Sequence, residues 1–243
     1  IFNENLTTNK YNELQRNTDQ PLFNRAVLGT YSPGSIIKPI LGLAALQLGV
    51  TNLTQRHICK GHYSLPGNTH RYRDWLSSGH GSVNLHKAIS QSCDVFFYEV
   101  GGRIGIDRMH DYLDQFGLGQ KTNIELAGER TGLIPSTKWK KAMFSKKEDK
   151  NWFPGETVIA SIGQGYMLAT PLQLANATAA LATRGNRFKP TLISAIENPI
   201  NNEKIFNESQ ELTQIKIDSQ SYWEEIISAM HNVMQGSGTA RNV

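Results

Sequence analysis

The sequence predicts a mixed α/β fold of the α+β class, in which helices predominate and strands are short. Four segments carry apolar residues at helical spacing, at residues 36–48, 106–116, 172–183 and 222–234. Strand-like patterns are confined to shorter stretches, at residues 124–126, 190–196 and 215–217. With 39% hydrophobic and 19% charged residues in a chain of 243, the composition is that of a folded globular protein of one large or two small domains.

The first 30 residues are polar, with one short helical pattern at residues 11–17. Residues 31–39 (YSPGSIIKP) then lead from a Pro-Gly turn into the helix predicted over residues 36–48, with Ser35 at its start. Lys38 follows three residues later, so both side chains share one helix face. An uncharged amine can act as base for a serine hydroxyl, and the N–H groups of a helix start can bind an oxyanion. The same pattern also fits an N-cap serine beside a surface lysine.

Residues 50–82 form a long stretch without a regular pattern, rich in His, Arg and aromatic residues. A run of this length in a compact domain usually has a function or is held by another group. Asn84 then caps a short helix predicted at residues 85–91. The apolar run at residues 95–100 is expected to end at Gly101 and Gly102.

Residues 118–155 are predicted to be a loop rich in Gly and Lys. Six lysines at residues 138–150 supply much of the net charge of +4. Such a run is typical of a solvated loop, and the alternative is contact with an anionic membrane surface or an anionic lipid-linked substrate. Thr170 and Pro171 start a helix over residues 172–183 that is almost entirely apolar and is expected to be buried. No nucleic-acid-binding motif is found, so no nucleic acid partner is expected.

Several separated segments resemble one family. Residues 31–39 resemble the active-serine motif of the class B penicillin-binding proteins. Residues 92–94 (SCD) resemble the family's second motif, which is S-x-N in most members and S-x-D in the elongation-type enzymes. Further segments resemble the elongation-type enzymes, at residues 71–75 (RYRDW), 79–81 (GHG), 96–98 (FFY), 163–166 (GQGY) and 170–171 (TP). The resemblance extends from about residue 1 to residue 243.

The resemblance implies a penicilloyl-serine-transferase fold, similar to the β-lactamases, with an antiparallel sheet and an all-helical lobe. It also implies a peptidoglycan D,D-transpeptidase. In that reaction the serine attacks the carbonyl between two D-alanines of a stem peptide, and the amine of a second stem peptide resolves the acyl-enzyme. The β-lactams mimic the substrate and acylate the same serine.

The family's catalytic roles transfer to four positions of this sequence. Ser35 would be the nucleophile, Lys38 its base, and Ser92 a proton relay towards the leaving group. Asp94 stands where Asn is more common, and a carboxylate cannot donate a hydrogen bond as an amide can. We expect it to tune Lys38 electrostatically instead. Without the resemblance, Ser92 and Asp94 would be interpreted as a locally capped turn. Gly163, Gln164 and Gly165 are expected to line the substrate site.

The family's third motif, K-[ST]-G followed by Thr, is not found. The nearest match is Ser237-Gly238-Thr239, preceded by Gly236 instead of Lys, and it is not assigned. We therefore expect residues 1–243 to be a transpeptidase domain that stops before this motif and is catalytically incomplete. The chain begins with Ile1, so a fragment is expected, without the membrane anchor and N-terminal pedestal domain that the resemblance implies.

The resemblance also implies a place and partners for the protein. The expected location is the bacterial inner membrane, with the catalytic domain in the periplasm. The expected partners are peptidoglycan stem peptides and their lipid-linked precursor, β-lactam antibiotics, and a glycan-polymerising enzyme of the elongation machinery.

A structural zinc ion is a further expectation. Thiolate, imidazole and carboxylate groups form four-coordinate zinc sites, and some elongation-type penicillin-binding proteins carry zinc at positions that match Cys59, Asp74, His80 and Cys93. A Cys59–Cys93 disulfide or two free thiols remain the alternatives. Nearby histidines are possible substitute ligands, at His57, His62 and His70.

Other functions on the same fold also remain open. A serine β-lactamase or D,D-carboxypeptidase would need a group that activates a water for deacylation, and Glu125, Glu129 and Glu156 lie in no recognisable motif for that task. A non-catalytic scaffold or β-lactam sensor would use the pocket only for binding. No charged segment followed by an apolar one opens the chain, so no signal peptide is expected.

Overall fold

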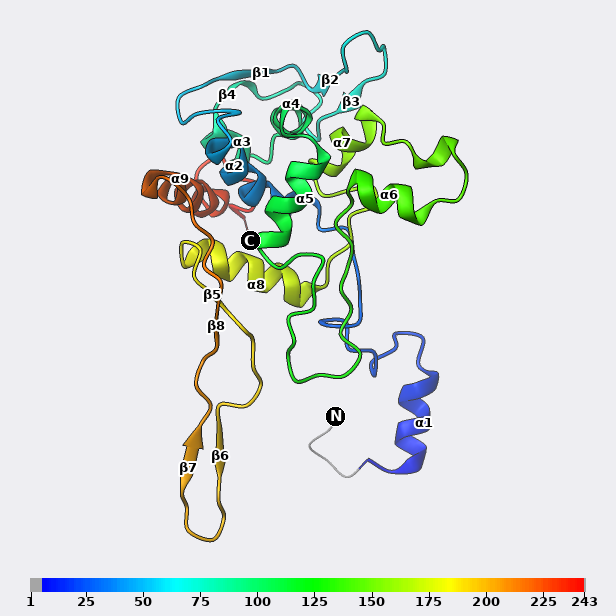
Figure 1. The fold of residues 1–243 in the computed structure, drawn as a ribbon, viewed down its shortest axis with the longest axis vertical. Coiled ribbons are helices and arrows are strands. Elements are labelled where there is room, and N and C mark those ends of the chain that lie inside the picture. Colours follow the sequence, from blue (N-terminus) through cyan, green and yellow to red (C-terminus); the bar gives the residue numbers. More distant parts are fainter. Residues whose placement is uncertain (1–5, 243) are drawn as a thin grey trace.

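The computed structural model describes residues 6–242. Its centre is helix α2 (Lys38–Gln47), which is surrounded by α3 (Leu85–Ser90), α4 (Asp94–Ile104), α5 (Ile106–Gln115) and α9 (Gln220–His231) (Figure 1). Residues 38–46 of α2 are all buried. A helix that is apolar on every side is stable only when other elements enclose it, which explains why four helices pack around this one.

The remaining helices lie around this centre or below it. They are α1 (Thr8–Arg16), η1 (Gly34–Ile37), α6 (Thr137–Met143), η2 (Glu148–Lys150), α7 (Pro154–Ala160), α8 (Pro171–Ala182) and η3 (Asn232–Met234). The expected helix starts at Asn84 and Thr170 are confirmed. The Asn84 side chain accepts a hydrogen bond from the N–H of Lys87 at 3.0 Å, and Thr170 and Gln173 form a reciprocal capping box.

Strands form four separate antiparallel pairs among the described residues. The pairs are β1 (His57–Cys59) with β4 (Gly81–Val83), β2 (His62–Tyr63) with β3 (Tyr72–Arg73), β5 (Arg187–Phe188) with β8 (Glu211–Leu212), and β6 (Ala195–Glu197) with β7 (Lys204–Phe206). The first two pairs lie within residues 50–82 and just beyond, where the sequence predicts no regular structure. Strands of two or three residues are too short to produce a detectable alternation.

The glycine pair in α4 does not end that helix, contrary to the prediction. Helix α4 continues to Ile104, and Gly105 with a φ of 82° follows it. A Cβ atom on Gly101 would lie 2.3 Å from the Cβ of Ser161. The glycine is therefore required by the close approach of α4 to the end of α7 and not by a turn.

The prediction of a loop over residues 118–155 is wrong for the second half of this range, which contains α6, η2 and the start of α7. Residues 124–126 and 215–217 form no strand, and the strand expected at 190–196 is confined to β6 at its end. Helix α8 is only partly buried, at Gln173, Ala177, Ala180 and Leu181, and its other residues are exposed or half-buried.

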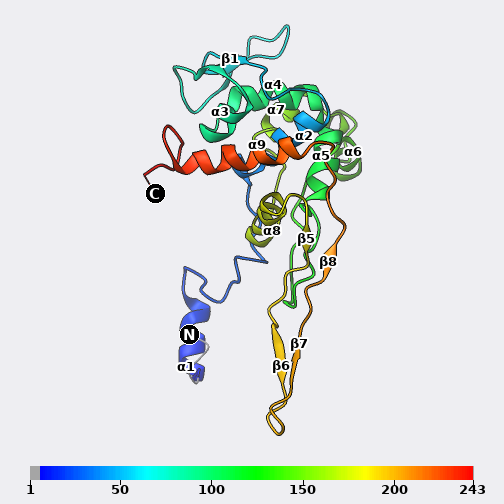
Figure 2. The same cartoon turned by 90° about the vertical axis from the view of Figure 1, so that its left-hand side faces the viewer.

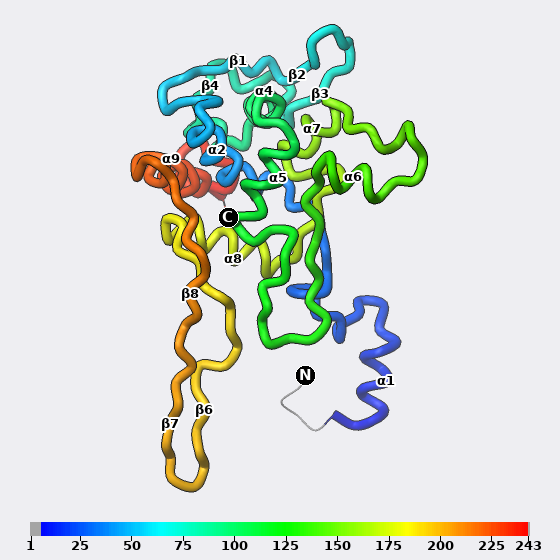
Figure 3. The backbone as a smooth tube through the Cα atoms, in the orientation of Figure 1, coloured from blue at the N-terminus to red at the C-terminus, as the bar shows by residue number. Residues whose placement is uncertain are grey.

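The outline of the molecule is uneven. The β6–β7 hairpin projects far from the helices (Figure 2), and the chain path in Figure 3 shows α1 set apart on the same lower side. None of the helices described within residues 6–242 has the length and apolar character needed to cross a bilayer.

Candidate active site

Ser35 lies inside the 3₁₀ turn η1, which continues directly into α2. The alternative interpretation of Ser35 as an N-cap residue does not hold, because Pro33 occupies the N-cap position and Ser35 is the second residue of the turn. The N–H of Gly34 donates to the carbonyl oxygen of Gly163 at 3.0 Å. A Cβ atom on Gly163, whose φ is 73°, would lie 2.2 Å from the carbonyl oxygen of Gly34. The backbone of Gly163 thus supports the turn that carries Ser35 and leaves the serine hydroxyl free for other partners.

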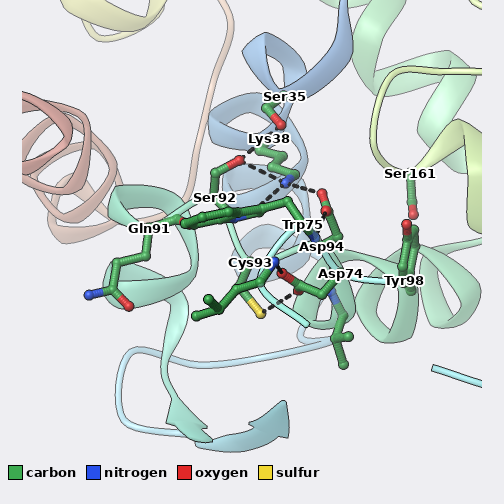
Figure 4. A network of polar contacts seen from close by, with 12 residues as sticks. Ser35, Lys38, Asp74, Trp75, Gln91, Ser92, Cys93, Asp94, Tyr98 and Ser161 are labelled. Atoms are coloured by element: carbon green, nitrogen blue, oxygen red, sulfur yellow. Dashed lines mark hydrogen bonds and ion pairs between the residues drawn. The ribbon is translucent and has the colours of Figure 1, made fainter. Parts of the chain in front are cut away.

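Lys38, Ser92 and Asp94 meet directly below this hydroxyl (Figure 4). Lys38 is only 1% exposed. Its Nζ lies 2.9 Å from the carbonyl oxygen of Ser92, 3.0 Å from the Oγ of Ser92 and 2.6 Å from Oδ1 of Asp94. An ammonium has three N–H donors, so these three contacts satisfy it completely. Burial of the charge is tolerated because Asp94 balances it.

Ser92 links the side chain of Lys38 to that of Ser35. Its Oγ lies 2.9 Å from the Oγ of Ser35, whereas the Nζ of Lys38 makes no hydrogen bond to the Ser35 hydroxyl in the described part of the chain. Ser92 has a φ of 53°, which is uncommon for a residue with a side chain. This backbone conformation brings both its carbonyl and its hydroxyl oxygen to Lys38. Strain of this kind is found at functional sites.

A cleft of about 460 Å³ opens above these groups. It is lined by Ser35, Trp75, Ser92, Asp94, Ile162, Gln164 and Thr239. Of the three residues predicted to line the substrate site, only Gln164 does so. Gly163 instead supports Gly34, and a Cβ atom on Gly165 would contact the side chain of Ile159 at 3.3 Å.

Trp75 and Thr239 are cleft residues that the sequence prediction did not assign. The N–H of Trp75 donates to Oδ2 of Asp94 at 3.1 Å, and its indole N–H donates to the carbonyl oxygen of Gln91 at 3.1 Å. Trp75 as a residue is 58% exposed, and it lines the cleft. The only signal in the sequence was the resemblance of residues 71–75 to the family, because contacts across 16 to 19 residues leave no local pattern.

The four residues expected to bind zinc form one buried cluster. One potential ligand atom from each of Cys59, Asp74, His80 and Cys93 lies within 4.8 Å of the others. Both cysteines are free thiols, so the structure does not contain the alternative disulfide. Burial raises the pKa of the Cys93 thiol far above its ordinary value, and the Asp74 carboxylate raises it further.

The cluster and the catalytic groups share a segment of chain. Asp74 directly precedes Trp75, and its Oδ2 accepts a hydrogen bond from the N–H of Val95 at 3.0 Å. Cys93 lies between Ser92 and Asp94. Any group that holds the cluster together therefore also fixes the backbone within the second motif, at Cys93, and just after it, at Val95.

The three glutamates considered as activators of water have other partners. Glu129 accepts hydrogen bonds from the N–H and the hydroxyl of Thr122, Glu156 pairs with Lys140, and Glu125 accepts a hydrogen bond from the N–H of Leu192. None of the three lines the cleft beside Ser35.

Comparison with known proteins now decides the family. Residues 3–243 match the family described as penicillin binding protein transpeptidase domain. The chain belongs to this family. The peptidoglycan D,D-transpeptidase MrdA of Acinetobacter baumannii is 40% identical over 251 residues, which cover 100% of this chain and 35% of the relative.

Solved structures of penicillin-binding proteins also align with the chain. Pseudomonas aeruginosa PBP2, in complex with WCK 5153, has a TM-score of 0.85 and 39% identity over 98% of this chain and 52% of its own. A chain from a peptidoglycan synthase complex, studied for its structural coordination of polymerization and crosslinking, has a TM-score of 0.79 and 29% identity over 99% of this chain and 38% of its own.

These comparisons confirm the penicilloyl-serine-transferase fold of a penicillin-binding protein and the expected resemblance to the elongation-type enzymes, which include penicillin-binding protein 2. The chain spans about a third of the length of the curated relative and about half of the Pseudomonas aeruginosa chain.

Proposed function

We propose that this chain is the transpeptidase domain of a peptidoglycan D,D-transpeptidase that cross-links stem peptides during cell elongation and so maintains cell shape. The observation that carries the proposal is the hydrogen-bonded chain from Lys38 through Ser92 to Ser35 at the floor of the cleft. A serine hydroxyl becomes an effective nucleophile when a positioned base removes its proton.

The contacts define a route for that proton. The ammonium form of Lys38 donates to all three oxygens, so it must first lose one proton to solvent. The amine that remains keeps two N–H donors for the Ser92 carbonyl and Asp94, and its lone pair faces the Ser92 hydroxyl, which turns to donate. As Ser35 attacks, its proton passes to the Ser92 oxygen while the Ser92 proton passes to Lys38. The departing D-alanine amine takes the proton back along the same route.

Acylation then follows the chemistry of the family. Ser35 adds to the carbonyl between the two D-alanines, and the C–N bond breaks to leave an ester on Ser35. The N–H of Ser35 lies in the first turn of η1, where it is available to the developing oxyanion. The amine of a second stem peptide attacks the ester, forms the cross-link and releases Ser35. A β-lactam enters the same route and stays attached.

Asp94 has a positioning role in this proposal. Its two carboxylate oxygens hold Lys38 and the N–H of Trp75. It therefore fixes the base and one wall of the cleft together, which agrees with the expectation that it acts on Lys38.

We also propose that Cys59, Asp74, His80 and Cys93 bind a zinc ion. The donor set fits a four-coordinate site, and all four side chains are buried. The thiols lie 3.5 and 3.6 Å from Oδ2 of Asp74, so the carboxylate is at the centre of the cluster. A bound zinc ion would supply structural cross-linking only, and the proton route uses none of these four residues.

The proposed setting rests on the family resemblance. We place the domain in the periplasm, at the bacterial inner membrane, with the lipid-linked peptidoglycan precursor as its substrate source and a glycan-polymerising enzyme as its partner. The likeness to a chain of a peptidoglycan synthase complex supports such a partner. Fractionation of cells that express a tagged protein tests the location.

The function is tested with a fluorescent penicillin on the whole protein as its gene encodes it. We expect one stable label per molecule, lost in Ser35→Ala and reduced by at least 1,000-fold in rate in Lys38→Met, on the order of the loss when a catalytic base is removed. Rapid turnover of the label would indicate a β-lactamase, and the absence of labelling would indicate a scaffold. Stable labelling without cross-linked product from purified precursor would indicate a sensor.

A further inference from the structure

Lys140 is buried in a part of the chain that the sequence predicts to be a solvated loop. Its side chain, on α6, is 4% exposed, and its Nζ lies 2.5 Å from Oε1 of Glu156. Four aromatic rings surround the ammonium with centroids 5.2 to 5.9 Å away, those of Phe144, Trp152, Phe153 and Tyr166. Lysine normally keeps its charged end in water. The enclosure of this one by a carboxylate and four rings calls for an explanation.

Glu156 connects Lys140 to helix α7. While Oε1 binds Lys140, Oε2 accepts a hydrogen bond from the N–H of Phe153 at 2.8 Å, at the start of the helix. The carboxylate therefore joins α6 to the first turn of α7. Helix α7 ends at Ala160, and the N–H of Gly163 donates to the carbonyl of Ala160 in the turn that follows.

Tyr166 connects the same enclosure to the far side of that turn. Its ring centroid lies 5.1 Å from that of Trp139, 6.0 Å from that of Phe144 and 6.4 Å from that of Trp152. The enclosure thus holds the chain at both ends of residues 161–165, through α7 on one side and through Tyr166 on the other.

Residues 163–169 in turn hold the segment that carries the nucleophile. Gly34 donates to the carbonyl of Gly163. Tyr31 and Ala169 exchange two backbone hydrogen bonds of 2.9 Å. A displacement of residues 163–169 would therefore move Ser35 relative to Ser92, which belongs to a different part of the chain.

We propose that Lys140 is a positioning residue for acyl transfer, which acts through Glu156 and Tyr166 to hold residues 163–169 against the Ser35 turn. The inference rests on the proposed function for its catalytic readout. A buried ion pair adds little net stability compared with apolar packing, so its value lies in the defined geometry that it imposes. Lys140 does not touch the cleft, and its effect reaches Ser35 only through the backbone.

The test compares Lys140→Met with Lys141→Met in the whole protein. Methionine keeps most of the apolar length of lysine and removes the charge, and Lys141 is the exposed neighbour on the same helix. Labelling is followed over a range of fluorescent penicillin concentrations, which separates the acylation rate at saturation from the dissociation constant of the complex that precedes acylation. The amount of label at the end of the reaction gives the number of active molecules. We expect Lys140→Met to lower the saturating rate at least 10-fold per active molecule, with the shape of its pH profile unchanged. Lys141→Met should match the wild type.

Amide hydrogen exchange supplies a readout that needs no activity. The backbone amides of residues 161–168 should exchange faster in Lys140→Met than in the wild type, and at the wild-type rate in Lys141→Met. A wild-type saturating rate together with wild-type exchange would overturn the inference, even if the melting temperature falls. If wild-type protein takes no label, the proposed function fails, and the exchange result alone decides about Lys140.

A second variant covers the case in which Lys140→Met does not fold. Tyr166→Leu keeps the Lys140–Glu156 ion pair and removes the ring contacts that hold the far side of the turn. It should lower the saturating rate in the same way. A folded Tyr166→Leu protein with the wild-type rate and exchange would overturn the inference on its own.

Discussion

Gly163→Ala tests whether the contact between Gly163 and Gly34 positions the nucleophile. The left-handed conformation of Gly163 costs an alanine about 1–2 kcal/mol. The added Cβ would also lie 2.2 Å from the carbonyl oxygen of Gly34. Overpacking of this kind typically costs about 1–3 kcal/mol. We therefore expect Gly163→Ala to lower the free energy of unfolding by about 2–5 kcal/mol.

The effect on catalysis follows from the same distance. The oxygen of Gly34 must retreat by about 0.8 Å to bring the contact from 2.2 Å to 3.0 Å, below which real Cβ contacts are essentially never found. Because Ser35 is the next residue, its hydroxyl moves with this backbone. A misplacement of about 1 Å can lower a rate on the order of 100-fold, so we expect a loss of this size in the rate of acylation by a fluorescent penicillin.

Gly165→Ala is the matched control. Its φ of 72° is almost the same as the 73° of Gly163, but its Cβ would meet only a methyl group of Ile159, at 3.3 Å. This variant should lose about 1–2 kcal/mol of unfolding free energy and keep its acylation rate within about threefold. The two free energies are measured by urea unfolding. If both variants lose the same stability and label at the same rate, the contact with Gly34 does not position Ser35.

Three further predictions concern the second motif, the cluster behind it, and the contact between His57 and Glu99. In Asp94→Asn, only one acceptor oxygen remains for the two donors on Lys38 and Trp75. The variant should therefore lose about 1–3 kcal/mol of unfolding free energy, measured by thermal unfolding, and react more slowly with a fluorescent penicillin. An unchanged stability and labelling rate would contradict the positioning role of Asp94. Metal analysis should find one zinc ion per chain. A chelator should lower the melting temperature of the wild-type protein but not that of Cys93→Ser. If the chelator lowers both melting temperatures equally, the cluster is not the zinc site. The hydrogen bond from His57 holds the pKa of Glu99 below its usual 4.5 against the opposing effect of burial. The stabilisation is therefore present above pH 4.5 and lost as the pH falls through the lowered pKa, so Glu99→Gln should be less stable than wild type at neutral pH and equally stable in acid; a pH-independent difference would count against it.

The candidate catalytic residues could be named from the sequence because each lies in a short segment with its own signal. Ser35 and Lys38 are three residues apart on one helical stretch, so their common face follows from helix geometry. The start of α3 at Asn84 follows from a side chain that caps the helix locally. Such features depend on residues within one turn of each other, and the sequence contains all the information that they need.

The basic run at residues 138–150 shows where this reasoning fails. Nothing in the local pattern separates Lys140 from its exposed neighbours. Its burial depends on Glu156 and on the Tyr166 ring, which reach it from residues 16 and 26 positions away. The strands β1 to β4 were missed for a similar reason, since each is stabilised by a partner strand and not by its own composition.

The sequence by itself determined the identity of the chemical groups and, through the family resemblance, the fold, and it suggested the reaction class that we propose. The tertiary structure alone decided how those groups connect. It places the Ser92 hydroxyl between Lys38 and Ser35, across 54 and 57 residues of chain. It also seats Gly163 against the turn that carries the nucleophile. These contacts join residues that are far apart in the chain, and only the packing of helices around α2 brings them within hydrogen-bonding distance.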